Sequence, residues 1–170
     1  MKYTTKEAIQ NFLLIQISPT FDTQIDTWIE VVSREIDNYT GRTFIADTEF
    51  STREYTGNDR YELIIDDAVA VEDYTALPYN KIPKTAIKAT TPFFRGTVYE
   101  ISGKWGYSVA VPEDIAHAAT IMTAGIINRG RKVGKIKQEK IGNYQVSYED
   151  DKDGLDEAYV ILDRYKKIWL

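Results

Sequence analysis

Apolar residues recur at helical spacing over residues 20–39, and this pattern predicts an amphipathic helix. Gly41 follows at the position where a left-handed C-terminal cap is expected. A shorter helix is predicted over residues 6–14, with Thr4 or Thr5 as its N-cap. The apolar stripe of the longer helix consists of Ile25, Trp28, Ile29, Val32, Ile36 and Tyr39.

The period changes to that of β-strands over residues 44–110, where glycine, proline and asparagine mark turns. This segment predicts a β-meander whose pairing order is left open. Residues 83–94 are bounded by prolines and have no clear period, so they are expected to form a loop or an edge strand. The expected strands are 49–55, 61–65, 68–74 and 97–105.

A third helix is predicted from Pro112 to about Asn128, with small residues that favour a central position, and a last helix from about Leu155 to Trp169. The chain is therefore expected to be a single α+β domain over residues 1–170. Its small bundle of about four helices comprises 1–43 and 111–170, and its β-rich insertion comprises 44–110.

Charge and cysteine content exclude several classes of function. The 170 residues include 21 basic and 26 acidic side chains, so the formal charge is −5 and any DNA contact should be local. With no cysteine, disulfides, thiolate metal sites and cysteine nucleophiles are excluded. No secretory signal and no apolar run of roughly 18 residues is present, so a soluble protein made in the cytosol is expected.

Two neighbouring segments carry opposite charge. Residues 149–157 hold six acidic residues against Lys152, and residues 129–140 hold six basic residues against Glu139. These segments are read as solvated loops, as an assembly interface, or, for the basic one, as a phosphate contact. The basic residues are Arg129, Arg131, Lys132, Lys135, Lys137 and Lys140.

Three weaker sequence signals bear on possible catalytic or binding chemistry. The segment from Gly130 to Lys135 lacks the spacing and the Ser or Thr of a phosphate-binding loop. The acidic turn has Val160 where a calcium loop needs a bidentate Glu, so it is interpreted as a helix cap. His117 has no cysteine or second histidine to complete a site and is interpreted as structural. We therefore expect no enzyme, no catalytic residue, no cofactor and no metal.

Three segments resemble the head-tail connector (adaptor) proteins of tailed double-stranded DNA phages and prophages. Residues 36–44 close an early helix in a Thr-Gly-Arg turn followed by Phe44. Residues 98–107 form a strand ending in Gly-Tyr, which leads into a Val-Pro-x-Asp-Ile helix start at residues 111–115. Residues 135–148 are similar to the family's Ile-Gly-x-Tyr-x-Val-x-Tyr stretch.

The resemblance implies a structural virion protein of the phage neck, assembled in the host cytoplasm. Family members form a ring of about twelve copies that joins the portal to the tail. The implied partners are other copies of the chain, the portal protein and a tail-completion or stopper protein, with transient passage of viral DNA and no membrane. The β-rich segment is long compared with that of compact members.

Within this interpretation, residues 129–148 are expected to be an assembly element that is mobile in the free subunit. Four residues would supply its apolar or amphipathic anchors: Ile141, Tyr144, Val146 and Tyr148. The alternative is an internal hairpin that packs on its own subunit. Two other functions also stay open: another neck or tail-completion protein, and a metal-dependent enzyme built on the carboxylates of Asp66, Asp67 and Asp73.

Overall fold

A computed structural model describes residues 1–77, 84–132, 138–141, 144–147 and 155–167. The chain divides into two compact units. The helical unit comprises Met1–Thr40 and Glu113–Lys166, and the β unit comprises Gly41–Pro112 and Lys167–Leu170. None of the helices in the described ranges is long and apolar enough to cross a membrane.

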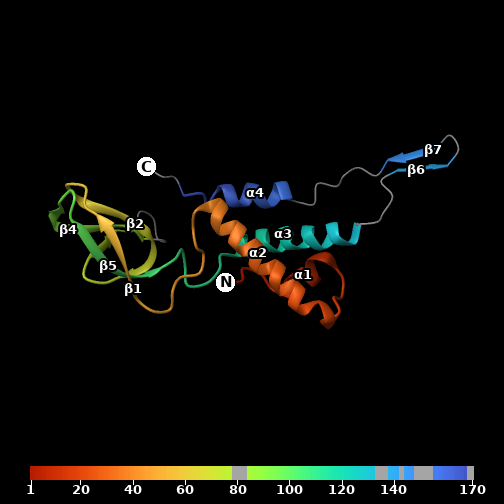
Figure 1. The fold of residues 1–170 in the computed structure, drawn as a ribbon, viewed down its shortest axis with the longest axis horizontal. Helices are drawn as coiled ribbons and strands as arrows, with labels where there is room; N and C mark the ends of the chain where they lie inside the picture. Colours follow the sequence, from red (N-terminus) through yellow and green to blue (C-terminus); the bar gives the residue numbers. More distant parts are fainter. Residues whose placement is uncertain (78–83, 133–137, 142–143, 148–154, 168–170) are drawn as a thin grey trace. The chain divides into compact units, whose positions relative to one another are not determined.

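The helical unit begins with α1 (Lys6–Leu13), the short 3-10 helix η1 (Pro19–Phe21) and α2 (Asp22–Thr40) (Figure 1). Thr5 is the N-cap of α1, and its hydroxyl oxygen accepts a hydrogen bond from the Ala8 N–H at 3.2 Å. Gly41 follows α2 with a φ of 68°, as the cap pattern predicts. Both N-terminal helices are thus where the hydrophobic pattern places them.

The two remaining helices of this unit are α3 (Glu113–Lys132) and α4 (Leu155–Asp163). α3 contacts α1, α2 and α4, so the expectation that it is central is confirmed. It continues past Asn128 through Gly130, whereas α4 ends before the predicted residue 169. The Thr4 hydroxyl joins the α3 hydroxyl of Thr120 at 2.6 Å, and this contact ties the N-terminal segment to the bundle.

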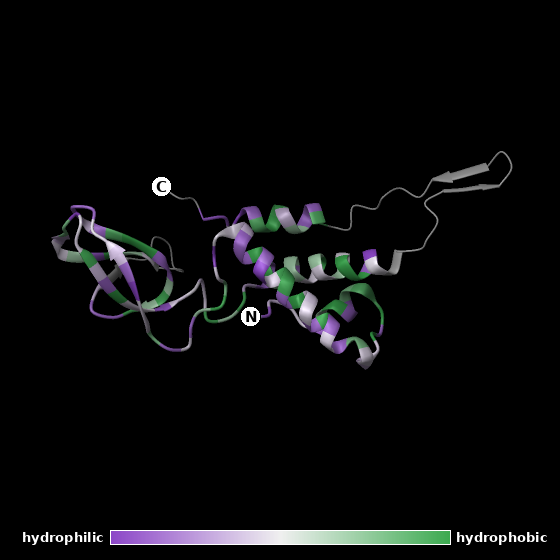
Figure 2. Cartoon of the chain, in the orientation of Figure 1, coloured by the Kyte–Doolittle hydropathy of each residue, from purple (hydrophilic) through white to green (hydrophobic). Residues whose placement is uncertain are grey.

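The buried face of α2 is the predicted stripe, with two differences, because Trp28 and Tyr39 are only partly buried. Ile25 and Ile29 form a cluster with Ile9 of α1 and Ile127 of α3, while Trp28 is only half-buried against that cluster. Figure 2 shows hydrophilic and hydrophobic residues distributed along the same helix. A stripe wider than the buried interface leaves some of its members partly in solvent.

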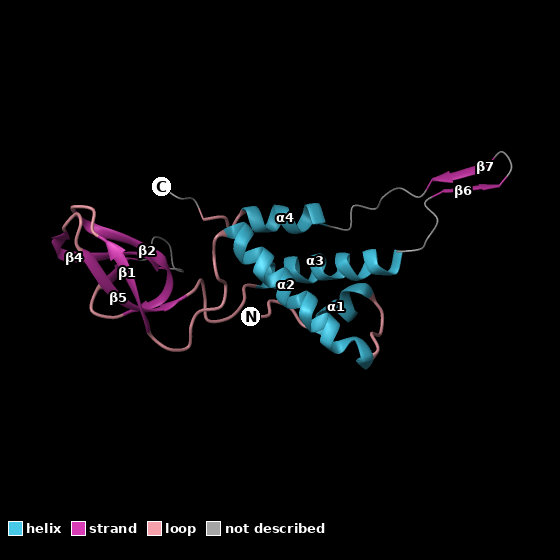
Figure 3. Cartoon of the chain, in the orientation of Figure 1, coloured by secondary structure: helices cyan, strands magenta, loops and turns pink. Residues whose placement is uncertain are grey.

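The β unit holds a five-stranded antiparallel sheet with the order β1-β5-β2-β4-β3 (Figure 3). Its core consists of Leu63, Ile65, Ala68, Ile87, Phe93, Ile101 and Trp105. The strands are β1 (Ser51–Thr56), β2 (Arg60–Val71), β3 (Thr75–Leu77), β4 (Lys84–Phe93) and β5 (Val98–Trp105).

The α+β class, with a helical bundle and an inserted sheet, is confirmed, but details of the sheet differ from expectation. Only β3 and β4 are neighbours both in the chain and in this sheet, so the order is not that of a simple meander. Two predicted strands merge into β2, which has a register shift between Ile64 and Ala68. Such an irregularity interrupts the alternation of apolar and polar residues by which a strand is predicted from the sequence.

The segment expected to be a loop or edge strand is β4, which lies between β2 and β3. β3 pairs only with residues 86–88 of β4. Pro92 lies beyond this pairing, so its missing N–H leaves no gap in the β3–β4 ladder. A proline therefore fits in an interior strand because the neighbouring strand is short.

Candidate functional site

The predicted assembly residues fall on three elements and on undescribed residues. Arg129, Arg131 and Lys132 lie in the last turn of α3. Lys140 and Ile141 belong to β6 (Gln138–Ile141), and Tyr144 and Val146 belong to β7 (Tyr144–Ser147). Lys135, Lys137 and Tyr148 lie outside the described residues.

Residues 129–132 are helical, which corrects the interpretation of this part of the basic segment as a loop. A helix leaves its last carbonyls without intrahelical partners, which gives its C-terminus a partial negative charge. Basic side chains in the last turn are stabilised by that charge. The added residues Arg129, Arg131 and Lys132 are all basic, so helix extension is physically consistent with their charge despite Gly130.

β6 and β7 pair as an antiparallel two-stranded sheet. In its register Ile141 lies opposite Tyr144, and Glu139 lies opposite Val146. Directly paired residues share a face, so this register places Ile141, Tyr144 and Val146 on one face. Lys140 and Gln145 form a pair on the other face.

The rival hypothesis of a carboxylate metal site depends on the placement of Asp66, Asp67 and Asp73. Asp66 and Asp67 lie in the irregular part of β2, whereas Asp73 lies beyond the strand with a φ of 61°. Within the described residues, no group of three or more His, Cys, Asp or Glu side chains could hold a metal ion. The geometry of these acids therefore does not support that hypothesis.

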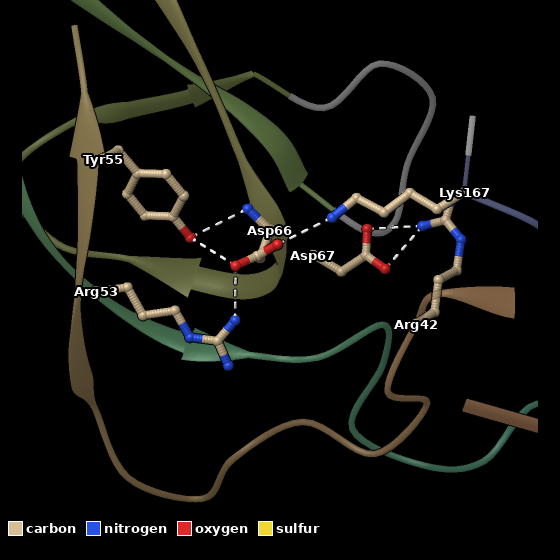
Figure 4. A network of polar contacts seen from close by, with 6 residues as sticks. All are labelled: Arg42, Arg53, Tyr55, Asp66, Asp67 and Lys167. Carbon is tan, nitrogen blue, oxygen red and sulfur yellow. Dashed lines mark hydrogen bonds and ion pairs between the residues drawn. The ribbon is translucent and has the colours of Figure 1, made fainter. Parts of the chain in front are cut away.

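Asp66 is instead the centre of a charged cluster in the β unit (Figure 4). Its Oδ1 accepts a hydrogen bond from Lys167 Nζ at 2.9 Å. Its Oδ2 accepts hydrogen bonds from Arg53 Nη1 at 2.8 Å and from the Tyr55 hydroxyl at 3.0 Å. The same hydroxyl accepts a hydrogen bond from the Asp66 N–H at 3.2 Å, which fixes the tyrosine on the strand.

The cluster shifts two pKa values. Burial acts to raise the pKa of Asp66, but hydrogen bonds from Lys167 and Arg53 outweigh burial and lower that pKa below its usual value of 3.8. Burial is the main reason that the pKa of Tyr55 rises to about 12. At neutral pH the carboxylate is therefore charged and the phenol is protonated, which is the state that the hydrogen bonds require.

Asp67 forms the second half of the cluster. Arg42 Nη1 lies 2.6 Å from one carboxylate oxygen of Asp67 and 2.7 Å from the other. The Asp67 side chain is 5% exposed and that of Arg42 is 16% exposed. The Arg42 guanidinium also lies 5.6 Å from the centre of the Tyr107 ring. These contacts give both aspartates a structural role in holding the chain.

The sequence pattern does not predict this charged cluster. Arg53 and Tyr55 are two residues apart on a strand and so lie on one face, which was the only local signal. Their partners come from β2 and from the residue at position 167.

His117 is exposed, and its ring meets Phe12 edge-on at 6.1 Å between centroids, so it packs at the surface of the bundle.

Two of the three segments that carry the sequence resemblance have their β-unit parts side by side, around Thr43 and Tyr107. The Tyr107 N–H donates to the Thr43 carbonyl at 2.8 Å, and the Ala46 N–H donates to the Ser108 carbonyl at 2.8 Å. The Phe44 ring is fully buried and packs on Tyr107. The resembling residues thus form a packed junction at the point where the chain enters and leaves the sheet.

Comparison with known proteins identifies a structural neighbour. No protein-family model matches the sequence, and no curated protein matches it. The fold is similar to that of a chain from a structure described as the neck of an empty GTA particle computed with C6 symmetry. The two chains are 11% identical with a TM-score of 0.56, and the match covers 96% of this chain and 89% of that chain.

Proposed function

We propose that this chain is a structural protein of the neck of a phage or phage-like particle. The observation that carries the proposal is the fold similarity to a chain from a particle neck, which extends over nearly all of both chains. The connector-like segments support it independently, because two of them form the buried junction of Phe44 and Tyr107. Asp66 and Asp67 form ion pairs with arginine side chains, which is an arrangement typical of a structural role.

In this proposal copies of the chain assemble into a ring that joins the portal to the tail and surrounds the path of the DNA. The neighbour's symmetric particle favours an oligomeric assembly. The proposed assembly element is residues 129–148, which includes the basic end of α3 and the β6–β7 hairpin. A two-stranded hairpin is only marginally stable alone in water, so contact with a neighbouring copy or with the portal would stabilise it.

Electron microscopy of the purified chain with and without its portal protein tests the proposal. We expect rings on the portal, and a monomer or small oligomer in free solution, because charges at the rim of an interface contribute more to specificity than to affinity. Light scattering over a range of concentrations measures the free state. Absence of any complex with portal and with tail-completion proteins would contradict the neck role.

A charge-reversal variant tests the assembly element. Lys135→Glu with Lys137→Glu should leave the free energy of unfolding within about 0.5 kcal/mol of wild type, as for ordinary surface changes. Co-sedimentation with portal should weaken, and the loss should depend on salt. The matched control is Lys88→Glu with Lys104→Glu, which makes the same change in charge on the β unit. Equal docking by both variants would refute an electrostatic role for residues 129–148.

A further inference from the structure

Two connections of the β unit, residues 57–59 between β1 and β2 and residues 94–97 between β4 and β5, lie against each other and are called the paired tip below. The Gly57 N–H donates to the Thr97 carbonyl at 2.9 Å. A Cβ at position 57 would lie 2.1 Å from the carbonyl oxygen of Phe94, so the two connections approach this closely only because residue 57 is glycine.

Further hydrogen bonds hold the paired tip in one conformation. Asp59 has a φ of 62°, and its Oδ1 accepts a hydrogen bond from the Arg95 N–H at 2.7 Å. The Tyr99 hydroxyl accepts a hydrogen bond from the Phe94 N–H at 2.8 Å. A residue other than glycine keeps a positive φ only where the surrounding structure fixes it. The tip is therefore pre-organised by the β unit itself.

This ordered tip places apolar side chains in solvent. Phe94 is 58% exposed, and Val98 and Tyr61, near the starts of the adjoining strands, are 56% and 53% exposed. The Arg95 side chain is 79% exposed and lies 3.5 Å from that of Asp59. Aromatic and arginine side chains are enriched in the centres of protein interfaces. A pre-organised tip that exposes both is typical of a docking surface.

The outer face of α2 has a shallow hollow of about 330 Å³, called the α2 hollow below. The described residues that line it are Val31, Arg34, Glu35 and Asn38. Val31 is 41% exposed. The Tyr159 hydroxyl donates a hydrogen bond to Glu35 Oε1 at 2.9 Å, which fixes the position of this carboxylate. The hollow thus combines an apolar side chain with one cation and one carboxylate, as the paired tip does.

The charges of the paired tip and of the α2 hollow are complementary. Arg95 of the tip has the charge that Glu35 attracts, and Asp59 has the charge that Arg34 attracts. Because both surfaces belong to this chain, their match indicates another copy of the chain as the occupant. Exposed charges orient association more than they strengthen it, which agrees with a chain that assembles mainly on the portal.

We propose that the paired tip of one copy docks in the α2 hollow of a second copy. Phe94 packs on Val31 in this contact, and Arg95 pairs with Glu35. The tip and the hollow are different surfaces, so the contact is heterologous and repeats around a ring. This inference rests on the proposed neck role, for which it names a contact between copies in addition to residues 129–148.

Disulfide formation between two single-cysteine variants tests the contact, because the chain has no cysteine of its own. A disulfide between Phe94→Cys and Val31→Cys requires their Cα atoms to come within about 7 Å. Full-length chains of the two variants, one of them tagged, are mixed at high concentration and oxidised. The mixed dimer should form at least about fivefold faster than in a control mixture of Phe94→Cys with Val109→Cys, because docking raises the local thiol concentration. Val109 is 81% exposed, so its thiol is accessible.

A charge swap across the two chains tests the orientation. Arg95→Glu on the Phe94→Cys chain should slow formation of the mixed dimer, and so should Glu35→Arg on the Val31→Cys chain. With both changes present the charges are again opposite, and the rate should return close to its starting value. Lys88→Glu makes the same change in charge on β4 and should leave the rate unchanged. Thermal melting of each variant checks that it is folded.

Three results would overturn the proposal. A rate no higher than that of the control mixture would show that the tip does not enter the hollow. Equally fast disulfide formation by Phe94→Cys alone would show that two tips meet. Failure of the double swap to restore the rate would show that Arg95 and Glu35 do not pair.

The same measurements separate this contact from the neck role. Rings on the portal protein together with a control-level rate would refute the contact and leave the neck role intact. Fast formation of the mixed dimer, without binding to portal or tail-completion proteins, would support the contact and contradict the neck role.

Discussion

The rings of Phe44 and Tyr107 pack with their centroids 5.4 Å apart and join the start of the β unit to the segment that follows β5. Gly106 precedes Tyr107 with a φ of 142°, and a Cβ at this position would lie 2.4 Å from the Cα of Ala46. The close approach of the two segments therefore requires glycine at position 106.

Gly106→Ala should destabilise the protein by roughly 2 kcal/mol or more, because it combines an unfavourable φ with a backbone clash. Urea unfolding followed by fluorescence measures the change. The comparison variant is Phe44→Leu, which keeps the backbone path and should cost less. A midpoint for Gly106→Ala equal to that of wild type would show that the junction tolerates a side chain.

Gly130→Ala should have the opposite effect. Gly130 lies inside α3, and, apart from its chain neighbours and the nearby helix backbone, no described atom lies within 4 Å of a Cβ added there. Alanine in a helix is favoured over glycine by about 0.8–1.0 kcal/mol, so the free energy of unfolding should rise by up to that amount. A fall in stability would show that the helix ends before Gly130.

Arg42→Ala should lower the free energy of unfolding by roughly 3 kcal/mol, because it leaves the carboxylate of Asp67 buried without its partner. Arg95→Ala is the control. Arg95 lies 3.5 Å from Asp59, and the two side chains are 79% and 57% exposed, so the expected loss is under about 0.5 kcal/mol. Similar losses in the two variants would contradict the structural role of Asp67.

Asp66 makes stability depend on pH in a defined direction. Its pKa is lower in the folded chain than the usual 3.8, so the unfolded chain binds more protons in the acidic range. The stabilisation is complete above the unfolded pKa and is lost as the pH falls through the folded pKa. Between about pH 6 and about pH 3, Asp66→Asn should therefore lose less free energy of unfolding than wild type.

The comparison of wild type with Asp66→Asn also controls for the titration of other acidic side chains. Burial raises the pKa of Asp37, and a hydrogen bond from Tyr39 lowers that of Asp163, but both groups are present in wild type and in Asp66→Asn. The difference between the two pH profiles thus belongs to Asp66. Parallel profiles would show that its carboxylate has the same pKa in the folded and unfolded chains.

The burial of α2 predicts different costs for two adjacent residues. Ile29→Ala should cost roughly 3 kcal/mol, because the isoleucine is 1% exposed in the helical core. Trp28→Ala should cost less than the 3–5 kcal/mol typical of a fully buried tryptophan, about 2 kcal/mol, because Trp28 is half-buried. Denaturant titrations of both variants decide the order, and a larger loss for Trp28→Ala would contradict this burial.

The local pattern of apolar, polar and capping residues was sufficient to predict the elements that are stabilised by interactions between near neighbours in the chain. The apolar stripe of α2, the Thr5 cap of α1 and the start of α3 after Pro112 are all predicted by residues within a few positions of each other. Helical periodicity and capping act over one or two turns, so the sequence determined these helices and the α+β class.

Tertiary structure decided the features that depend on distant partners. The strand order of the sheet, the interior position of β4 and the binding of Asp66 by Lys167 each join residues far apart in the chain. Strand propensity does not specify which strand is the neighbour, and a charged side chain can pair with any opposite charge that packing brings near it. For this reason Asp66 and Asp67 could be read from the sequence as possible metal ligands, whereas the folded chain binds them with Lys167 and Arg42.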